Sequence, residues 1–223
     1  MKKLNATLIG ATGLIGSHLF EILQKHQAFD KITVLSRRPI AFNQQNTMAK
    51  VINFENEEQL KEGIEGSDVV FCAVGTTMKN VGGNKDAYRK VDFQIPETAA
   101  RLSKELGCEH FVMVSAVGAS SKSRNFYVKL KGDAEGAVSS KGLRAVSIFR
   151  PSLLLGKRHE FRFAEMLASA IMPFFSFLVP AKYKPVNARD VARAMAASAI
   201  ENPEGNRIYH YNEIISLSLK LKV

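Results

Sequence analysis

The stretch LNATLIGATGLIG, residues 4–16, carries the strongest structural signal in the chain. The run from Leu4 to Ile9 is short and largely apolar, as expected for a buried strand, and three glycines follow it. Beyond the first two glycines, apolar residues recur at the spacing of one helix face: Ile15, Leu19, Ile22 and Leu23. The stretch therefore predicts a strand, a tight turn and a helix.

Gly10, Gly13 and Gly16 stand three residues apart in this turn. Glycines allow the backbone to turn tightly and to approach a pyrophosphate, and the N-terminus of the following helix offers free N–H groups and a partial positive charge. The spacing differs from the more familiar Gly-x-Gly-x-x-Gly, so the interpretation depends on the flanking strand and helix. We interpret the turn as a dinucleotide-binding site, and the alternative is an ordinary glycine-rich turn.

Apolar segments and amphipathic helices alternate along the rest of the 223-residue chain, of which 46% is hydrophobic. One helix is marked by Ile95, Ala99 and Leu102, and another begins at Asn187 as an N-cap. Continuous apolar strands between helices are typical of a parallel sheet covered on both faces. We predict an α/β fold with a doubly wound parallel sheet, as one domain over residues 1–223. The further strands are expected at 31–36, 50–54, 68–74, 111–114 and 145–149.

Residues 157–186 interrupt this alternation with many aromatic and apolar side chains. The longest uncharged stretch, 166–181, is shorter than the roughly 20 residues that a membrane span needs, and Pro173 interrupts it. We therefore expect no membrane span. We predict that 157–186 is a lid or substrate-pocket insertion in a small C-terminal substrate region, with the surface of a homo-oligomer as the alternative.

Charge and cysteine content limit the possible partners and compartment. The net charge is +10, but the basic residues are spread along the chain without a nucleic-acid-binding motif. We expect a small anionic ligand, or only increased solubility, and no nucleic acid. Cys72, Cys108 and the five histidines lack metal-ligand spacing, so no metal site is expected. No apolar signal segment precedes the first strand, and the two cysteines stand far apart in sequence, which fits a reducing compartment. Together these features predict a cytoplasmic protein.

Arg37 and Arg38 follow directly on Ser36, the last residue of the second predicted strand. A site that prefers NAD places an acidic residue there for the ribose 2′-hydroxyl, but this chain has no Asp or Glu until Glu55. A guanidinium beside that ribose suits a 2′-phosphate. The sequence therefore favours NADP(H) over NAD(H), and the alternative is that the arginines face water.

Three further residues have side chains suited to proton transfer. Ser115 follows the fifth strand, at the edge where doubly wound sheets bind ligands. Tyr127 and Lys131 stand one helical turn apart, on the same face. A neighbouring ammonium lowers the pKa of a phenol toward neutral pH, and a serine hydroxyl can hold a substrate oxygen. The alternative is a surface tyrosine packed on a solvated lysine stem.

The combined motifs resemble the short-chain dehydrogenase/reductase superfamily, in its atypical branch, and most of all the oxidoreductase family of the Tat-interacting tumour suppressor and its bacterial relatives. The resemblance covers most of the chain, weakens after about Arg162, and implies a Rossmann-type NAD(P)-binding fold. The matching segments are 71–77, 91–92, 110–115, 125–132 and 149–155.

The resemblance implies that Ser115, Tyr127 and Lys131 form the catalytic set. It also implies that the three glycines hold the pyrophosphate, that Val74 and Gly75 pass beside the adenosine ribose, and that Pro151 lies near the nicotinamide. The predicted cofactor-binding residues are Gly10, Thr12, Gly13, Leu14, Ile15, Gly16, Arg37, Arg38, Asn53, Phe54, Val74, Gly75, Thr76, Lys131 and Pro151.

Two positions depart from the superfamily pattern. Asp92 stands where members often carry an Asn that supports a water relay to the lysine. It either serves similarly or is an N-cap, with Pro96 in the first turn of the next helix. Asn53 stands where many relatives have an Asp that contacts adenine, which predicts a looser adenine contact.

These features predict an NADPH-dependent reductase of a small carbonyl compound. The main alternative is a non-catalytic NADP(H)-binding regulatory or partner-binding protein that uses the apolar residues 161–178 as an interface. A nucleotide-sugar epimerase agrees less well with the sequence, because such enzymes generally retain NAD and carry a larger C-terminal substrate domain.

Overall fold

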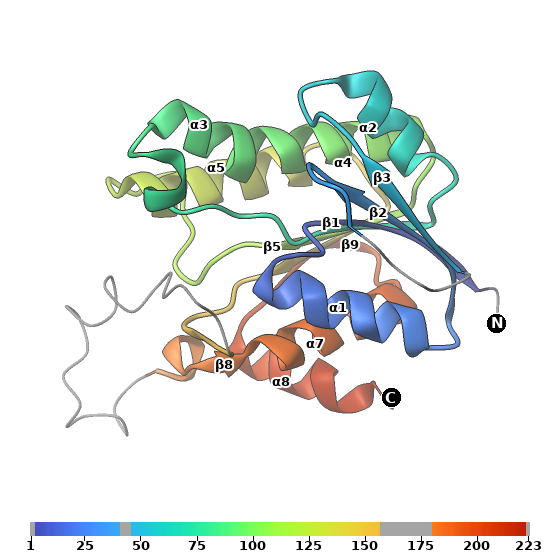
Figure 1. The fold of residues 1–223 in the computed structure, drawn as a ribbon. Helices are drawn as coiled ribbons and strands as arrows, with labels where there is room; N and C mark the ends of the chain where they lie inside the picture. The colour runs from blue at the N-terminus through green and yellow to red at the C-terminus, as the bar shows by residue number, and fades with distance from the viewer. Residues whose placement is uncertain (1–2, 41–45, 157–179, 222–223) are drawn as a thin grey trace.

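A seven-stranded parallel sheet lies at the centre of the molecule, in the order β3-β2-β1-β4-β5-β6-β9 (Figure 1). The computed structural model describes residues 3–40, 46–156 and 180–221. A separate parallel pair joins β7 (Leu154–Leu155) to β8 (Val186–Asn187). The strands of the large sheet are β1 (Leu4–Ile9), β2 (Phe29–Ser36), β3 (Thr47–Val51), β4 (Val69–Cys72), β5 (His110–Val114), β6 (Ala145–Phe149) and β9 (Gly205–Tyr209).

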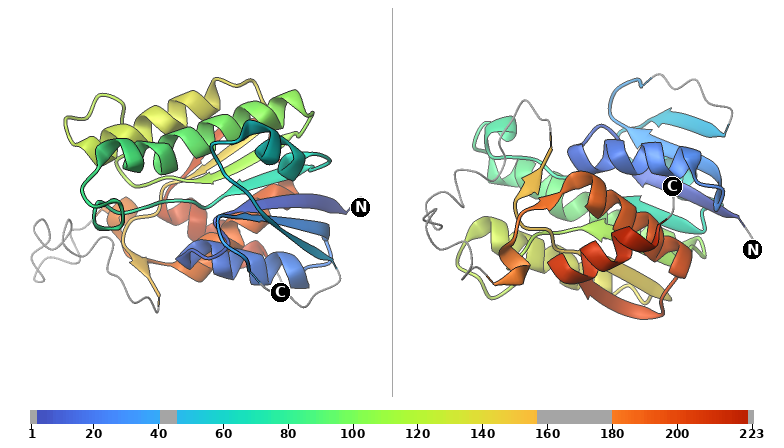
Figure 2. Two further views of the ribbon diagram at one scale, coloured as in Figure 1. Left: turned by 45° about the horizontal axis from the view of Figure 1, so that its top comes forward. Right: turned by 90° about the horizontal axis from the view of Figure 1, so that it is seen from below.

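Helices cover both faces of the sheet (Figures 1 and 2). One layer holds α1 (Leu14–Lys25), α7 (Ala188–Glu201) and α8 (Tyr211–Lys220). The other holds α2 (Glu57–Ile64), α3 (Lys85–Arg89), α4 (Ile95–Glu105) and α5 (Phe126–Ser139). A π-helical turn, η2 (Lys90–Gln94), joins α3 to α4, and short 3₁₀ turns lie at η1 (Lys79–Val81) and η4 (Ala181–Tyr183). The predicted doubly wound α/β fold is confirmed.

Two apolar cores, one on each side of the sheet, explain why the strands read as continuous apolar runs. Successive residues of a strand point to opposite faces. Leu8 and Phe71 therefore pack in the core under α1, α7 and α8, whereas Ile9 and Cys72 pack in the core under α2, α4 and α5. All four side chains are buried. A strand between two helix layers has no face that must be polar.

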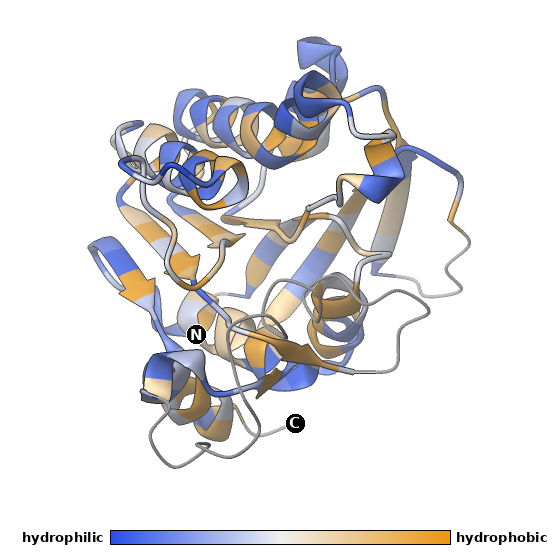
Figure 3. Cartoon of the chain, turned by 90° about the vertical axis from the view of Figure 1, so that its left-hand side faces the viewer, coloured by the Kyte–Doolittle hydropathy of each residue, from blue (hydrophilic) through white to orange (hydrophobic). Residues whose placement is uncertain are grey.

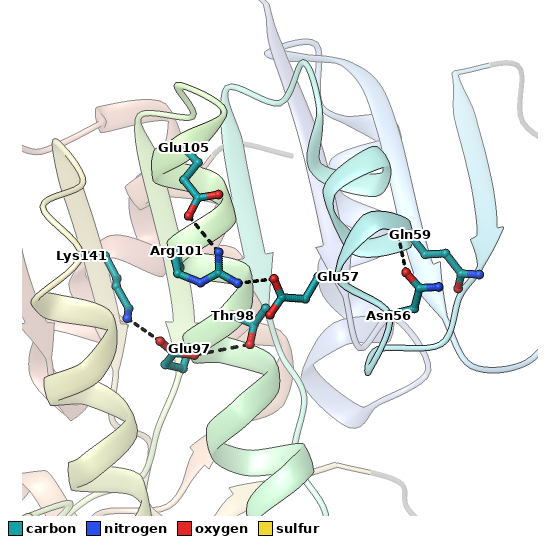
Figure 4. A network of polar contacts seen from close by, with 8 residues as sticks. All are labelled: Asn56, Glu57, Gln59, Glu97, Thr98, Arg101, Glu105 and Lys141. Atoms are coloured by element: carbon teal, nitrogen blue, oxygen red, sulfur yellow. Dashed lines mark hydrogen bonds and ion pairs between the residues drawn. The ribbon is translucent and has the colours of Figure 1, made fainter.

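Surface ion pairs connect the helices of the second layer (Figure 4). Arg101 of α4 binds Glu57 of α2 at 2.6 Å and Glu105, one turn further along α4, at 2.8 Å. Glu97 of α4 binds Lys141, which follows α5. Exposed pairs of this kind typically contribute about 0–1 kcal/mol each, so the apolar core stabilises this layer more than they do.

The structure differs from the predicted elements in several places. The third strand is at 47–51, where 50–54 was expected. β9 and α8 were not predicted. β9 is an edge strand whose residues 205–208 are exposed, so its sequence carries no apolar run. Asn187 precedes α7 as expected, but its side chain makes no capping hydrogen bond. Most of the predicted insertion at 157–186 lies outside the described residues, which resume at Pro180.

Within the described parts of the chain, no helix has both the length and the apolar character that a membrane crossing requires.

Candidate functional site

The glycine turn lies at the carboxyl edge of the sheet, between β1 and α1. Gly10 has φ +95°, and a Cβ there would lie 2.8 Å from the carbonyl group of Ala73. A Cβ on Gly16 would lie 2.0 Å from the carbonyl oxygen of Gly10. Gly13 is the N-cap of α1, has no side chain to bond the first N–H groups, and is followed by no acidic residue in the first turn. The turn thus brings backbone close to backbone and leaves helix N–H groups available to an anion.

A cavity of about 720 Å³ opens beside this turn, where the sheet order reverses on either side of β1. Its size is within the usual range of ligand pockets, and its place is the one where open α/β sheets bind their ligands. Figure 3 looks onto this edge, with the strands between the two helix layers. The predicted residues that line it are Gly10, Thr12, Gly13, Arg37, Arg38, Phe54, Val74 and Gly75.

Eight further residues line the cavity and were missed by the sequence reasoning. Some stand directly beside predicted residues, so the strand ends could have indicated them. Val91 and Ile95 are separated in sequence from the rest, and their apolar side chains look like ordinary core residues. The eight are Ala11, Leu35, Ser36, Pro39, Ile40, Ala73, Val91 and Ile95.

Arg37 and Arg38 lie directly after β2, on the wall of the cavity. The hydroxyl of Ser36 donates a hydrogen bond of 2.7 Å to the carbonyl oxygen of Arg38, which shapes this bend. No Asp or Glu is among the described residues that line the cavity. The lining therefore offers cations, and no carboxylate, to a bound ligand.

Seven predicted cofactor residues do not line the cavity. Ile15 is buried in the apolar core beneath α1. The backbone N–H of Asn53 bonds Gln59 at 2.7 Å, and its side chain accepts the N–H of Glu55 at 3.0 Å, so Asn53 shapes the turn before α2. The backbone N–H of Thr76 donates to Asp92. The others are Leu14, Gly16, Lys131 and Pro151.

Ser115 lies at the carboxyl end of β5, where its N–H donates a 2.7 Å bond to the carbonyl oxygen of Phe149 on β6. The residue is buried, and its hydroxyl has no hydrogen-bond partner within the described residues. A buried polar group without a partner lowers stability by about 1–3 kcal/mol. Such a group is expected where a ligand supplies the missing bond.

Tyr127 and Lys131 lie on consecutive turns of α5. Asn125 caps this helix by accepting the N–H of Val128 at 3.1 Å, which places Tyr127 in the first turn. The half-buried ring of Tyr127 packs edge-to-face on Tyr88, with centroids 6.4 Å apart. Lys131 is buried, and its Nζ lies 2.8 Å from Oδ1 of Asp92. The predicted pair therefore lies on one face of α5, with Tyr127 half-buried and Lys131 buried.

Asp92 is not an N-cap, because helical backbone precedes and follows it in the π-helical turn η2. The N–H of Ile95 donates to the carbonyl oxygen of Lys90, five residues earlier. Pro96 lacks the N–H that would continue a regular α-helix. π-helical turns are frequent at functional sites. Of the two roles expected for Asp92, the structure supports contact with the lysine, through a direct ion pair.

Burial and charge act in opposite directions on Lys131. Burial favours the neutral amine and lowers the pKa of Lys131, but the carboxylate and hydrogen bond of Asp92 raise it. The net direction is a raised pKa, so Lys131 is an ammonium at neutral pH. Cys72, at the end of β4, is different: burial raises its pKa to about 12, so it remains a thiol.

The structure also places Pro151 and Cys108. The carbonyl oxygen of Pro151, which follows β6, accepts the N–H of Val117 at 2.9 Å, so the loops after β5 and β6 lie together. Cys108 is buried with a pKa raised to about 12, mainly by burial. No cluster of three or more potential metal ligands occurs among the described residues.

Comparison with known proteins adds sequence relatives. A family model described as NAD(P)H-binding matches residues 10–202. Protein HTATIP2 of Rattus norvegicus is 33% identical over 171 residues, which cover 75% of this chain and 70% of that protein. The mitochondrial protein FMP52 of Eremothecium gossypii is 32% identical over 221 residues, which cover 96% and 97%.

Solved structures share the fold at low sequence identity. MoeE5 in complex with UDP-glucose and NAD has a TM-score of 0.70 at 15% identity, covering 97% of this chain and 81% of its own. A UDP-N-acetylglucosamine 4-epimerase from Methanobrevibacter ruminantium M1 gives the same values. At this identity the likeness concerns the fold alone.

The predicted cytoplasmic location is wrong by this comparison. FMP52 proteins from Eremothecium gossypii, Debaryomyces hansenii and Saccharomyces cerevisiae, 31–33% identical to this chain, are all named as mitochondrial. Buried thiols indicate only that no oxidising compartment is required, and they do not distinguish one reducing compartment from another.

The family resemblance and the fold predicted from the sequence are both confirmed. The glycine turn, the cavity beside it and the sequence relatives agree with each other. This chain belongs to the NAD(P)H-binding family, as a homologue of HTATIP2 and the FMP52 proteins with a Rossmann-like, oxidoreductase-like fold.

Proposed function

We propose that this protein is an NADP(H)-dependent oxidoreductase that reduces a small carbonyl compound, with Ser115, Tyr127 and Lys131 as its catalytic residues. One observation carries the proposal. A buried ammonium, that of Lys131, lies one helical turn from Tyr127, at the sheet edge where the dinucleotide cavity opens. Burying a charged lysine is costly, which favours a chemical role over the alternative of a solvated surface lysine.

The described residues fit a phosphorylated dinucleotide. Gly10 and Gly13 would let the backbone N–H groups of the turn approach the pyrophosphate. Arg37 and Arg38 would pair with the 2′-phosphate, and Lys131 would bind the nicotinamide ribose. Hydride transfer is the chemistry that a reduced nicotinamide supplies when bound.

The side chains would control the proton. Tyr127 would donate its phenolic proton to the alkoxide oxygen that forms from the carbonyl. The Lys131 ammonium, one helical turn away, would stabilise the resulting phenolate. The hydroxyl of Ser115, buried and without a partner among the described residues, would donate a hydrogen bond to the same substrate oxygen.

Tyr127→Phe tests the proposed proton donor. General acid catalysis typically contributes about 10²–10⁴-fold, so turnover of an aldehyde, ketone or quinone with NADPH should fall by that factor. NADPH binding by calorimetry should stay within about twofold, because the phenol is not proposed to bind the cofactor. Tyr211→Phe on α8, in the opposite helix layer, is the matched control and should retain full turnover.

Equal turnover by Tyr127→Phe and the unchanged protein would exclude this mechanism. Tight NADPH binding by the unchanged protein, without turnover of any probe, would instead support the non-catalytic alternative.

The double variant Arg37→Asp/Arg38→Asp tests the preference for NADP(H). A charged hydrogen bond is worth about 1.5–3 kcal/mol, so NADPH binding should weaken by about 10-fold or more for each lost contact. NADH binding should change little. Lys25→Asp/Lys31→Asp makes the same charge change at exposed positions near the opposite edge of the sheet, and controls for the overall field. An unchanged ratio of NADPH to NADH affinity in the arginine variant would contradict the assignment.

A further inference from the structure

The carboxylate of Asp92 connects two parts of the candidate site. Its Oδ1 lies 2.8 Å from Nζ of Lys131, and its Oδ2 accepts the backbone N–H of Thr76 at 2.8 Å. The Asp92 and Lys131 side chains are only 1% and 6% exposed. Thr76 directly follows Gly75, which lines the cavity. One buried carboxylate therefore joins the candidate catalytic lysine to the cavity wall.

The backbone around Asp92 fits this connecting position. Val91 and Ile95, both in or beside the π-helical turn, line the dinucleotide cavity. Asp92, next to Val91, instead reaches toward Lys131 on α5. The turn η2 thus presents apolar side chains to the cavity and a carboxylate to the lysine.

Asp92 is the counter-charge that Lys131 needs. The other titratable groups that act on its ammonium are the phenol of Tyr88 from α3 and the thiol of Cys72 from β4, and Tyr127 lies one turn earlier on α5. Phenols and thiols ordinarily ionise above neutral pH, so they supply no negative charge there. The helix α4 and the strand β6 also pack on α5, but the groups that act most strongly on this ammonium are Asp92, Tyr88 and Cys72.

We propose that Asp92 is a positioning residue, whose carboxylate keeps the buried Lys131 charged and holds it against the Thr76 loop. An asparagine at this place could accept the Thr76 hydrogen bond but would bring no charge. Asp92 then acts on the reaction only through Lys131. The effect on catalysis rests on the proposed function, whereas the effect on the charge of Lys131 does not.

Asp92→Asn separates charge from shape, because the amide has the size of the carboxylate and still accepts one N–H. Protein with ¹³C-labelled lysine ε-carbons is titrated by NMR without cofactor, and the Lys131 signal is assigned by its loss in Lys131→Met. Burial is then opposed only by the smaller effects of Tyr88 and Cys72, so Lys131 in Asp92→Asn should lose its proton more than about one pH unit lower than in the unchanged protein. Asp92→Glu, which keeps the charge, should restore most of this difference.

The matched control is Asp133→Asn, which removes the partner of Lys129 at 2.7 Å on the same helix. Lys129 is half exposed, so water solvates it in either case, and the signals of Lys129 and Lys131 should both stay in place. A Lys131 titration that is the same in Asp92→Asn and the unchanged protein would overturn the proposal. If Asp92→Asn does not fold, Asp92→Asn/Lys131→Met should fold, and failure of both would equally overturn it.

Turnover gives a separate measurement. With NADPH and the same carbonyl probes, the high-pH limb of the rate profile should move to lower pH in Asp92→Asn and return in Asp92→Glu. A purely structural role would lower the rate at every pH without moving this limb. An unchanged protein that turns over no probe would count against the proposed function alone, because the lysine titration needs no turnover.

Discussion

At Gly16, a single absent methyl group decides how closely α1 approaches the end of β1. The backbone there is ordinary helix, and the restriction is purely steric, because a Cβ would lie 2.0 Å from the carbonyl oxygen of Gly10. Gly10 is restricted in a second way, through its φ of +95°. The same turn lines the candidate dinucleotide cavity, so the two glycines determine both the packing of α1 and the shape of the site.

Gly16→Ala should therefore destabilise the protein and weaken NADPH binding. Forcing a methyl group into a packed site typically costs about 1–3 kcal/mol, and in a chain of this length each kcal/mol lowers Tm by about 2–4 °C. Gly136→Ala is the control, because Gly136 is an exposed residue inside α5 whose added Cβ would meet no atom within 4 Å. It should raise stability by about 0.5–1 kcal/mol. Thermal denaturation that shifts equally in both variants would contradict the steric argument.

At the scale of elements, α7 shows how a helix of small residues fits between neighbours. It packs against both α1 and α8, and most of its residues are buried. Alanines at Ala188, Ala192, Ala194 and Ala196 are fully buried. Small side chains on several faces let three helices and the sheet approach one another closely. The structure buries this helix on several sides because α8, which was not predicted, also covers it.

Ala196→Leu should overpack this layer. The added side chain has no space at a fully buried position, so the free energy of unfolding should fall by about 1–3 kcal/mol. Arg189→Leu places the same side chain at an exposed position of the same helix and should change it by less than about 0.5 kcal/mol. Urea denaturation of both variants measures the difference. Equal midpoints would mean that α7 is not closely packed at Ala196.

At the scale of the whole molecule, the order of the strands creates the site. The chain winds outward from β1 to β3, then crosses to β4 and continues to β9 on the other side. The loops after β1 and β4 therefore separate at the carboxyl edge, and the cavity opens between them. Residues from the end of β2, from the turns after β1, β3 and β4, and from η2 and the start of α4 meet there, although they are far apart in sequence. The assignment of residues 1–223 to one domain stays a prediction.

Local patterns in the sequence were sufficient for the layered fold and the glycine turn. Apolar strand runs, the spacing of a helix face and the glycine spacing of the turn are patterns of neighbouring residues, so they can be read from the sequence directly. The sequence also predicted that Arg37 and Arg38 lie at the ligand-binding edge, because they follow a strand and the carboxyl ends of adjacent parallel strands meet at one edge.

Only the tertiary structure decided the role of Asp92, the contribution of Val91 and Ile95 to the cavity, and the edge strand β9. Asp92 beside Pro96 is locally compatible with an N-cap, and nothing near it in sequence shows that a buried ammonium lies against it. Such a contact depends on how α5 packs on η2, which is set by the shared apolar core and not by the residues on either side of Asp92. Local sequence encodes local backbone, whereas the charge that a buried group meets is decided by which distant segment the core brings to it.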